Sequence, residues 1–287
     1  MERNTQFDIH YCFADDVRYE NDTHPDFWKT FWEQGNGLGR IPIELIDPDS
    51  RSRKLYEYHS HLYGNRALPN GKKFIFEIGQ DGYSSFQLIC GNSNKCFGSD
   101  TLVNSYCNSK EVRPNCIQKI KEDEFDNDES EFKKWVEEYI RKAYTIGNMI
   151  IFPKQPSINC ERWNCVRDRV DLTMECIHRH YLGNSGNPLD KNRVLQANAD
   201  FFELFGAGEE GFRNYIDFFF LNPIVDDNYK VKCLLPHKEG QEFLCENDFE
   251  NPLPKNKDEY KCWRKNTMKF IDARNNLINE FLQNKEN

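Results

Sequence analysis

The chain has 287 residues, of which 38% are hydrophobic and 30% charged, and its formal net charge is −9. Binding along a nucleic-acid backbone needs clustered Lys and Arg, and the sequence has no long basic run, so we expect no extended nucleic-acid binding. No stretch approaches the ~18 apolar residues of a membrane span, and the first ten residues lack an apolar signal region. We therefore expect a cytoplasmic protein that does not contact a membrane.

Short apolar runs and turn residues predict strands in the N-terminal half. Asn-Gly at 70–71 favours the positive φ of a tight turn, and strands are expected after it at 72–78 and 85–90. A loop rich in Gly, Asn and Ser is expected to follow and to end at Ser99 and Asp100. Alternating or continuous apolar residues predict further strands at 7–13 and 149–152, and a weak edge strand at 229–235.

Helical spacing of apolar residues predicts helices in both halves of the chain. The acidic stretch 121–131 is expected to be an exposed loop that leads into one of them. The predicted helices cover 24–32, 52–63, 130–144, 165–182, 189–205, 209–221 and 256–283. The fold class is therefore α+β, with a strand-rich N-terminal half packed on a mostly helical C-terminal half. We expect a single domain over 1–287, with a subdivision into 1–153 and 154–287 as the alternative.

The eleven cysteines include no C-x-x-C pair, which is the spacing typical of zinc and redox sites. Reduced, mostly buried thiols are the expected state, and no metal site is predicted. The alternative is a metal held by Cys160 and Cys165 together with His178 and His180.

Established catalytic motifs are absent from the sequence. The G-x-G-x-G at 35–39 is followed by Arg-Ile-Pro rather than by the start of a helix, so it does not predict a dinucleotide loop. No nucleophile elbow, Walker loop, H-E-x-x-H or kinase motif is present. The sequence therefore leaves open whether the chain is an enzyme, and it indicates no particular cofactor.

Segment 144–181 is the most informative for function, because a strand, a polar loop and a helix follow one another there. A helix that begins after a polar loop presents unpaired N–H groups and a partial positive charge, which favours an anion. We predict an anion site at Ser157, Asn159 and Arg162. Arg169 is expected to add a second guanidinium, which can bind phosphate through two donors.

Four residues are predicted to handle protons. Asp171 and Glu175 lie four residues apart on one helical face, and they form either the wall of an active site or a structural row of ion pairs with neighbouring arginines. His59 lies on the buried face of a predicted helix, where it is either an acid–base group or a satisfied core histidine. Asp100 is either a general base or a cap of a local turn.

Two functions fit these features. The first is an enzyme, or a degenerate enzyme, that acts on a nucleotide or another phosphorylated substrate, so a phosphorylated small molecule is the expected ligand. The second is a non-catalytic interaction or inhibitor protein in bacterial or phage defence or anti-defence. A protein partner is then expected, because aromatic and Arg residues dominate protein interfaces.

Residues 168–181 read DRVDLTMECIHRHY. They resemble a bacterial family of unknown function whose members typically read D-R-F-D-L-T-L-E-C-I-R-R-H-Y at this place. Trp163 stands where that family has glycine, which leaves less room for a ligand beside Arg162. The resemblance spans nearly the whole chain and implies no activity or cofactor. It extends to residues 58–59, 68–71, 99–100, 144–147, 149–153, 157–159, 162 and 273–275.

Overall fold

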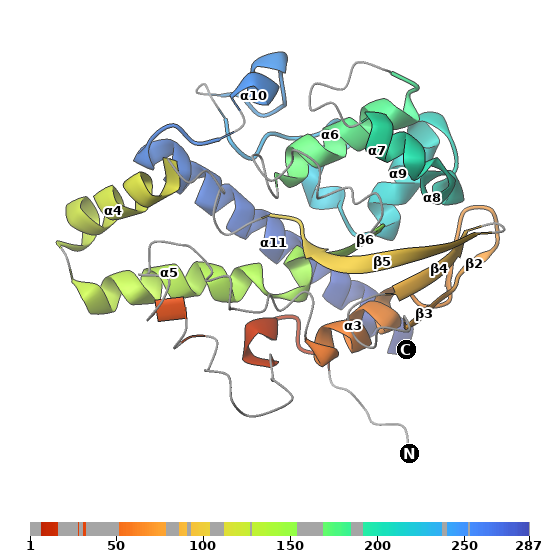
Figure 1. The fold of residues 1–287 in the computed structure, drawn as a ribbon, viewed down its shortest axis with the longest axis horizontal. Helices are drawn as coiled ribbons and strands as arrows, with labels where there is room; N and C mark the ends of the chain where they lie inside the picture. The colour runs from red at the N-terminus through yellow and green to blue at the C-terminus, as the bar shows by residue number, and fades with distance from the viewer. Residues whose placement is uncertain are drawn as a thin grey trace.

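The computed structural model describes residues 7–16, 28, 31–32, 52–78, 86–90, 93–103, 112–126, 128–153, 169–184, 192–236, 240–251 and 253–286. Helices account for most of this part of the chain, and a twisted sheet crosses it (Figure 1). The long C-terminal helix runs obliquely through the molecule and packs against two helices from the middle of the chain.

The main sheet has four strands in the order β3-β4-β5-β6, and every neighbouring pair is antiparallel. A separate two-stranded ribbon joins β1 to β2. In β5, alternate residues face the same side: the Phe97 ring contacts Phe201, and the Ser99 hydroxyl meets His59. The strands are β1 (Arg66–Ala67), β2 (Lys73–Phe74), β3 (Phe76–Ile78), β4 (Phe86–Cys90), β5 (Ser93–Thr101) and β6 (Met149–Pro153).

Helices α3 and α5 follow the predicted periodicity, whereas α4 was not predicted. Ser52 caps α3 by accepting a hydrogen bond from the Leu55 amide, and Asp128 caps α5 by accepting from Ser130 and Glu131. The helices are η1 (Phe13–Asp16), α3 (Arg53–Tyr63), α4 (Val112–Phe125), α5 (Glu129–Ala143), η3 (Ile146–Asn148), α6 (Val170–Tyr181), α7 (Asn192–Ala197), α8 (Ala199–Phe202), η5 (Glu203–Phe205), α9 (Gly208–Phe218), η6 (Asn222–Ile224), α10 (Glu246–Glu250) and α11 (Lys257–Glu286).

Several predicted strands and loops differ from the structure. The loop expected before Asp100 is wrong, because 93–101 form β5, a central strand with partners on both sides. The strand at 72–78 is interrupted at Ile75, and the strand at 7–13 is absent, since Phe13 begins η1 and residues 7–12 belong to no strand. The edge strand at 229–235 is reduced to isolated bridges.

Two further segments are helical in a way that differs from the prediction. The acidic stretch was expected to be a loop, but its first part completes α4. The single helix expected over 189–205 is divided at Asn198, whose buried side-chain amide donates to the Val194 carbonyl oxygen. An Asn side chain that bonds to the backbone competes with the regular helical pattern, and it separates α7 from α8.

The α+β class fits the structure in broad terms. A strand-rich N-terminal half is not confirmed, because α3, α4 and α5 alone contribute 11, 14 and 15 residues before position 153. Within the described ranges, no helix is long and apolar enough to cross a membrane. Single-domain organisation over 1–287 stays a prediction.

Arg274 of α11 joins three distant parts of the fold. Its side chain is fully buried and donates hydrogen bonds to the carbonyl oxygens of Ile146, Gly147 and Met149, to the Phe219 carbonyl oxygen and to the Tyr63 hydroxyl. No carboxylate in the described part of the chain pairs with it. The guanidinium is therefore stabilised by carbonyl dipoles, and it locks α11 to η3 and to the end of α9.

The C-terminus of α9 is closed by a Schellman motif. The Leu221 amide donates to the Ile216 carbonyl oxygen, and the Phe220 amide donates to the carbonyl oxygen of Asp217. Phe220 occupies the position usually taken by glycine, with φ of 56°. Arg66 donates to the Phe218 carbonyl oxygen, so its guanidinium lies at the negative end of the α9 dipole.

Candidate functional site

His59 and Ser99 meet where α3 packs on β5. The His59 side chain is fully buried, and its Nε2 lies 2.8 Å from the Ser99 hydroxyl oxygen. Burial, and then the positive charge of Arg274, lower the pKa of His59 to about 3. A general base works best with a pKa near the working pH, so a neutral imidazole in this position is a weak base. The geometry favours a core histidine whose Nε2 is paired with a hydroxyl.

Asp100 follows Ser99 on β5 and is half-buried. Its carboxylate accepts a hydrogen bond of 2.8 Å from the backbone amide of Thr101. Because successive strand residues face opposite sides, Asp100 and Ser99 point away from each other. The predicted acid–base use of Asp100 stays a prediction.

Asp171 and Arg169 form a buried ion pair at the start of α6. Arg169 Nε and Nη2 donate to the two carboxylate oxygens at 2.7 and 2.6 Å, and the side chains are 1% and 0% exposed. The amides of Leu172 and Leu234 also donate to Asp171. The carboxylate therefore already accepts four hydrogen bonds, an arrangement typical of a structural link between α6 and the segment at Leu234.

Glu175 forms a second and more accessible network. It accepts from Arg179 at 2.9 Å, and Arg179 also reaches Glu246 of α10 at 3.0 Å. Burial by itself would raise the pKa of Glu175, but hydrogen bonds from His178 and Arg179 outweigh it and lower that pKa. The predicted row of charges on α6 is thus present as ion pairs, with Asp171 and Glu175 in separate sets.

The predicted anion-binding residues Ser157, Asn159 and Arg162 lie outside the described residues, as do Cys160 and Cys165. Across the ranges that the structure describes, no group of three or more His, Cys, Asp or Glu side chains could hold a metal ion. Six cysteines there form no disulfide: Cys12, Cys116, Cys176, Cys233, Cys245 and Cys262.

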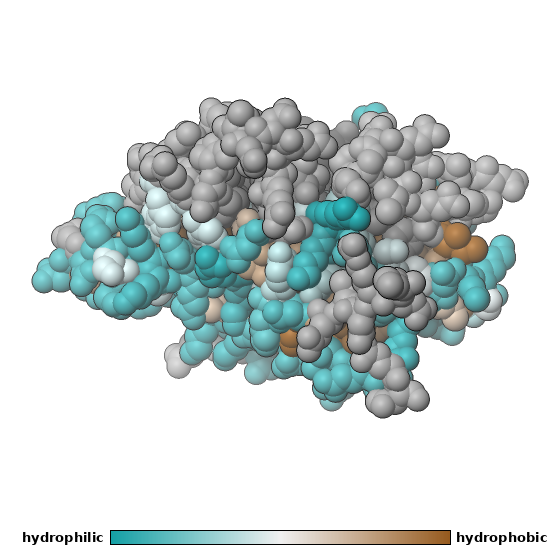
Figure 2. All heavy atoms as spheres, turned by 90° about the horizontal axis from the view of Figure 1, so that it is seen from below, coloured by the Kyte–Doolittle hydropathy of each residue, from teal (hydrophilic) through white to brown (hydrophobic). Residues whose placement is uncertain are grey.

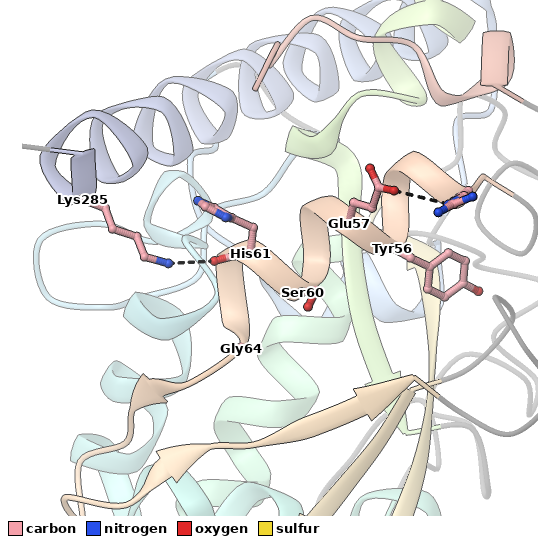
Figure 3. Close-up of a pocket in the computed structure, with 7 residues that line it drawn as sticks. Tyr56, Glu57, Ser60, His61, Gly64 and Lys285 are labelled. Atoms are coloured by element: carbon pink, nitrogen blue, oxygen red, sulfur yellow. Dashed lines mark hydrogen bonds and ion pairs between the residues drawn. The ribbon is translucent and has the colours of Figure 1, made fainter. Parts of the chain in front are cut away.

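One pocket of about 550 Å³ follows the surface of α3 (Figure 3). Its charged groups are largely occupied by contacts within the protein. Arg53 pairs with Glu57 at 3.4 Å, and Lys285 reaches from α11 to the His61 carbonyl oxygen at 3.1 Å. Its lining consists of Arg53, Tyr56, Glu57, Ser60, His61, Gly64 and Lys285.

A second pocket, of about 610 Å³, lies between α5 and α11. We refer to it as the α5–α11 pocket. Its volume is within the range of about 300–1,000 Å³ that is usual for small-molecule sites. Four of its side chains are cationic and two are anionic. The lining consists of Trp135, Glu138, Lys261, Cys262, Arg264, Lys265, Met268, Lys269 and Asp272.

The buried cation of this pocket is Arg264, which is 6% exposed. Its guanidinium lies 3.8 Å from the centre of the Trp135 ring and 4.8 Å from that of Tyr139. It also donates to the Trp135 carbonyl oxygen and lies 3.5 Å from Glu138. Cation–π contacts and these acceptors hold Arg264 in a fixed place on the pocket wall.

The acids of the α5–α11 pocket already have cationic partners. Asp272 accepts from Lys142 at 2.7 and 2.6 Å, and Glu138 is beside Arg264. By contrast, Lys265 and Lys269 are exposed and have no ion-pair partner among the described residues. Two positive charges are therefore left over on one wall of the pocket, in a protein whose net charge is −9.

One repeated spacing in the sequence corresponds to this arrangement, although it belongs to no established motif. Lysines recur every four residues at 257, 261, 265 and 269. Residues four apart are neighbours on a helical surface, so the spacing places like charges side by side at a small energetic cost. The spacing therefore predicts a row of cations along α11, and by itself it does not distinguish a binding surface from a solvated face.

The described surface offers little evidence of a hydrophobic docking site. Figure 2 shows one face of the molecule, on which the described residues are mostly hydrophilic with small hydrophobic areas. Among the described large hydrophobic side chains, Ile75 and Leu182 are the exposed ones, at 48% and 47%. Single exposed apolar residues are ordinary on protein surfaces.

Fold and pockets together define an α+β protein with a cation-lined pocket between two helices. Residues 7–278 match the model of a family described as "Family of unknown function (DUF6994)", and the chain belongs to that family. The resemblance to a family of unknown function is thereby confirmed. Neither the curated proteins nor the solved structures contain a match to this chain.

Segments that carry the family resemblance lie in contact with one another. Asn275 accepts a hydrogen bond of 2.6 Å from the Gly147 amide, beside the contacts of Arg274 with the same turn. The pair at 58–59 likewise meets the pair at 99–100 through His59 and Ser99. These contacts connect α3 with β5 and η3 with α11.

Proposed function

We propose that the protein binds a nucleotide or another phosphorylated small molecule, and that the α5–α11 pocket receives the phosphate groups. The observation that carries this proposal is the pair Lys265 and Lys269, two exposed ammonium groups on one pocket wall without an acidic partner in the described part of the chain. Each ammonium offers three donors and a full charge, which suits phosphate oxygens.

Energetics favour an anion at this place. Like charges four residues apart repel each other on a helix, and an anion between Lys265 and Lys269 removes that repulsion. Both lysines are exposed, so binding an anion requires little desolvation compared with a buried ion pair. The α3 pocket is the weaker candidate, because its Arg53 is already paired with Glu57.

The apolar groups of the pocket offer less specificity for a nucleobase than its lysines offer for phosphate. One face of Trp135 is covered by Arg264, and Phe132 stacks on the same indole with ring centres 6.1 Å apart. We therefore assign the recognition mainly to the phosphate part of the ligand. Turnover of that ligand is a separate proposal, in which Ser157, Asn159 and Arg162 stay the predicted contacts.

A thermal-shift series tests the binding proposal. Inorganic phosphate, pyrophosphate, ADP and ATP are added to the full chain at constant ionic strength, because a ligand that binds the folded state raises the melting temperature. We expect pyrophosphate and ADP to raise it for the wild type and not for the Lys265→Gln, Lys269→Gln double variant. No shift with any of these anions would contradict the proposal and favour the interaction or inhibitor function.

A matched control separates the effect of the two pocket charges from the effect of the net charge of the protein. Lys72 lies in the turn between β1 and β2, and Lys73 begins β2; both are exposed and far from α11 in sequence. The Lys72→Gln, Lys73→Gln variant changes the net charge by the same amount as the pocket variant. It should retain the wild-type shift with pyrophosphate.

A further inference from the structure

A third lysine of the α5–α11 pocket is already engaged by an acid of another helix. Lys261 lies 2.6 Å from the Glu124 carboxylate, and the two side chains are 44% and 33% exposed. Glu124 belongs to the last turn of α4, which packs against α11. Its neighbour Asp123 pairs with Lys257 in the same manner.

The helix geometry relates the lysines to the length of an anion. Four residues of α-helix rise about 6 Å, so Lys265 and Lys269 are separated by about that distance along the axis. Adding Lys261 extends the row to about 12 Å. Lys257 does not line the pocket; it pairs with Asp123 of α4.

We propose that Glu124 limits the phosphate chain that this pocket accepts to a short one, such as a diphosphate group. The inference rests on the proposed function, since it names the ligand class of the same pocket. With Glu124 on Lys261, Lys265 and Lys269 are the pocket lysines without an acidic partner in the ranges that the structure describes. A longer chain reaches Lys261 only by displacing a carboxylate that is tethered beside it and therefore has a high effective concentration.

The position of Glu124 makes the test practicable. Acids in the last turn of a helix face the negative end of its dipole, which is unfavourable. Glu124→Gln removes that repulsion while it removes an exposed ion pair of small energetic value. We therefore expect the variant to fold normally.

Glu122 provides a matched control on the same helix. It is exposed, and its carboxylate accepts from Gln118 rather than from a lysine of α11. Glu122→Gln changes the net charge as Glu124→Gln does but leaves Lys261 paired.

The experiment measures the Kd of pyrophosphate and of tripolyphosphate for the full chain at fixed ionic strength. We expect Glu124→Gln to tighten tripolyphosphate by about three- to fivefold relative to pyrophosphate, and Glu122→Gln to leave that ratio unchanged. An unchanged ratio in Glu124→Gln overturns the inference. Equal pyrophosphate binding by the wild type and the Lys265→Gln, Lys269→Gln variant, or no binding by either, overturns the proposed function instead.

Discussion

Arg274 and Phe219 are joined by two hydrogen bonds, in which Nε and Nη2 donate to one carbonyl oxygen at 3.1 and 3.0 Å. Phe219 is the C-cap of α9, where carbonyl oxygens lack partners within the helix. Burial lowers the pKa of Arg274, while the nearby Tyr63 hydroxyl acts in the opposite direction. A cation of α11 thus donates hydrogen bonds to the C-cap carbonyl oxygen of α9, 55 residues earlier in the chain.

Arg274→Lys should destabilise the fold strongly. A lysine has three donors instead of five, so several buried carbonyl oxygens would lose their partners, at about 1–3 kcal/mol each. We expect a loss of about 3 kcal/mol or more in the free energy of unfolding, measured by urea denaturation. Arg193→Lys, at an exposed position of α7, is the control. A loss below about 1 kcal/mol for Arg274→Lys would show that its contacts are replaceable.

Gly147→Ala should also destabilise the protein, because η3 lies directly on α11. A Cβ at Gly147 would clash with the Ile271 carbonyl oxygen and would lie 2.6 Å from Asn275 Cγ. Moving a helix backbone costs about 1–3 kcal/mol or more. At Gly183 a Cβ meets nothing, and only its positive φ of 67° opposes alanine. Denaturation should therefore rank Gly147→Ala as the more destabilising change, and the reverse order would contradict the packing.

Asp171→Asn tests whether the acids of α6 are structural. The substitution leaves Arg169 buried without that carboxylate, which costs about 3–5 kcal/mol in comparable buried pairs. Glu175→Gln removes a more exposed pair with Arg179 and should cost about 1 kcal/mol or less. Melting curves of both variants measure the difference. Equal, small effects would leave Asp171 available for another role.

His59 should make the fold sensitive to acid. Its pKa is lowered from 6.5 to about 3 by burial and by Arg274, so below pH 6.5 the unfolded chain binds a proton that the folded chain does not. Stability is then complete above pH 6.5 and declines as the pH falls toward 3. The expected loss between pH 7 and pH 5 is about 2 kcal/mol.

Carboxylates also titrate in part of this pH range. The contribution of His59 is therefore taken from the difference in stability between variants. His59→Gln should remove most of the loss between pH 7 and pH 5 in urea denaturation. His10→Gln, at an exposed position, should keep the wild-type slope. Identical slopes for all three proteins would show that His59 is not protonated on unfolding.

The sequence predicted those elements whose signals are local. Apolar spacing marks α3 and α5, and a run of apolar residues marks β6. Strand β5 could not be found in this way, because its residues Ser93–Thr101 are largely polar and its conformation depends on pairing with β4 and β6. Tertiary pairing outweighed local composition there.

The candidate site shows the same limit. His59 was expected on the buried face of its helix, and it is buried, whereas Asp171 was expected in a row of charges and is also buried. Their partners Ser99, Arg169 and Leu234 follow from the fold and determine what the two side chains can do. The roles of Lys265 and Lys269 depend on which neighbouring acids are already paired, and the spacing of the lysines alone does not reveal this.

The most direct test of the account is the Kd of ADP, measured by isothermal titration calorimetry for the wild type and the Lys265→Gln, Lys269→Gln variant. Two lost ammonium–phosphate contacts of about 0.7 kcal/mol each predict a Kd about tenfold higher. The Lys72→Gln, Lys73→Gln control should stay within about twofold of the wild type. Equal affinity in the wild type and the pocket variant would contradict the assignment of the phosphate to the α5–α11 pocket.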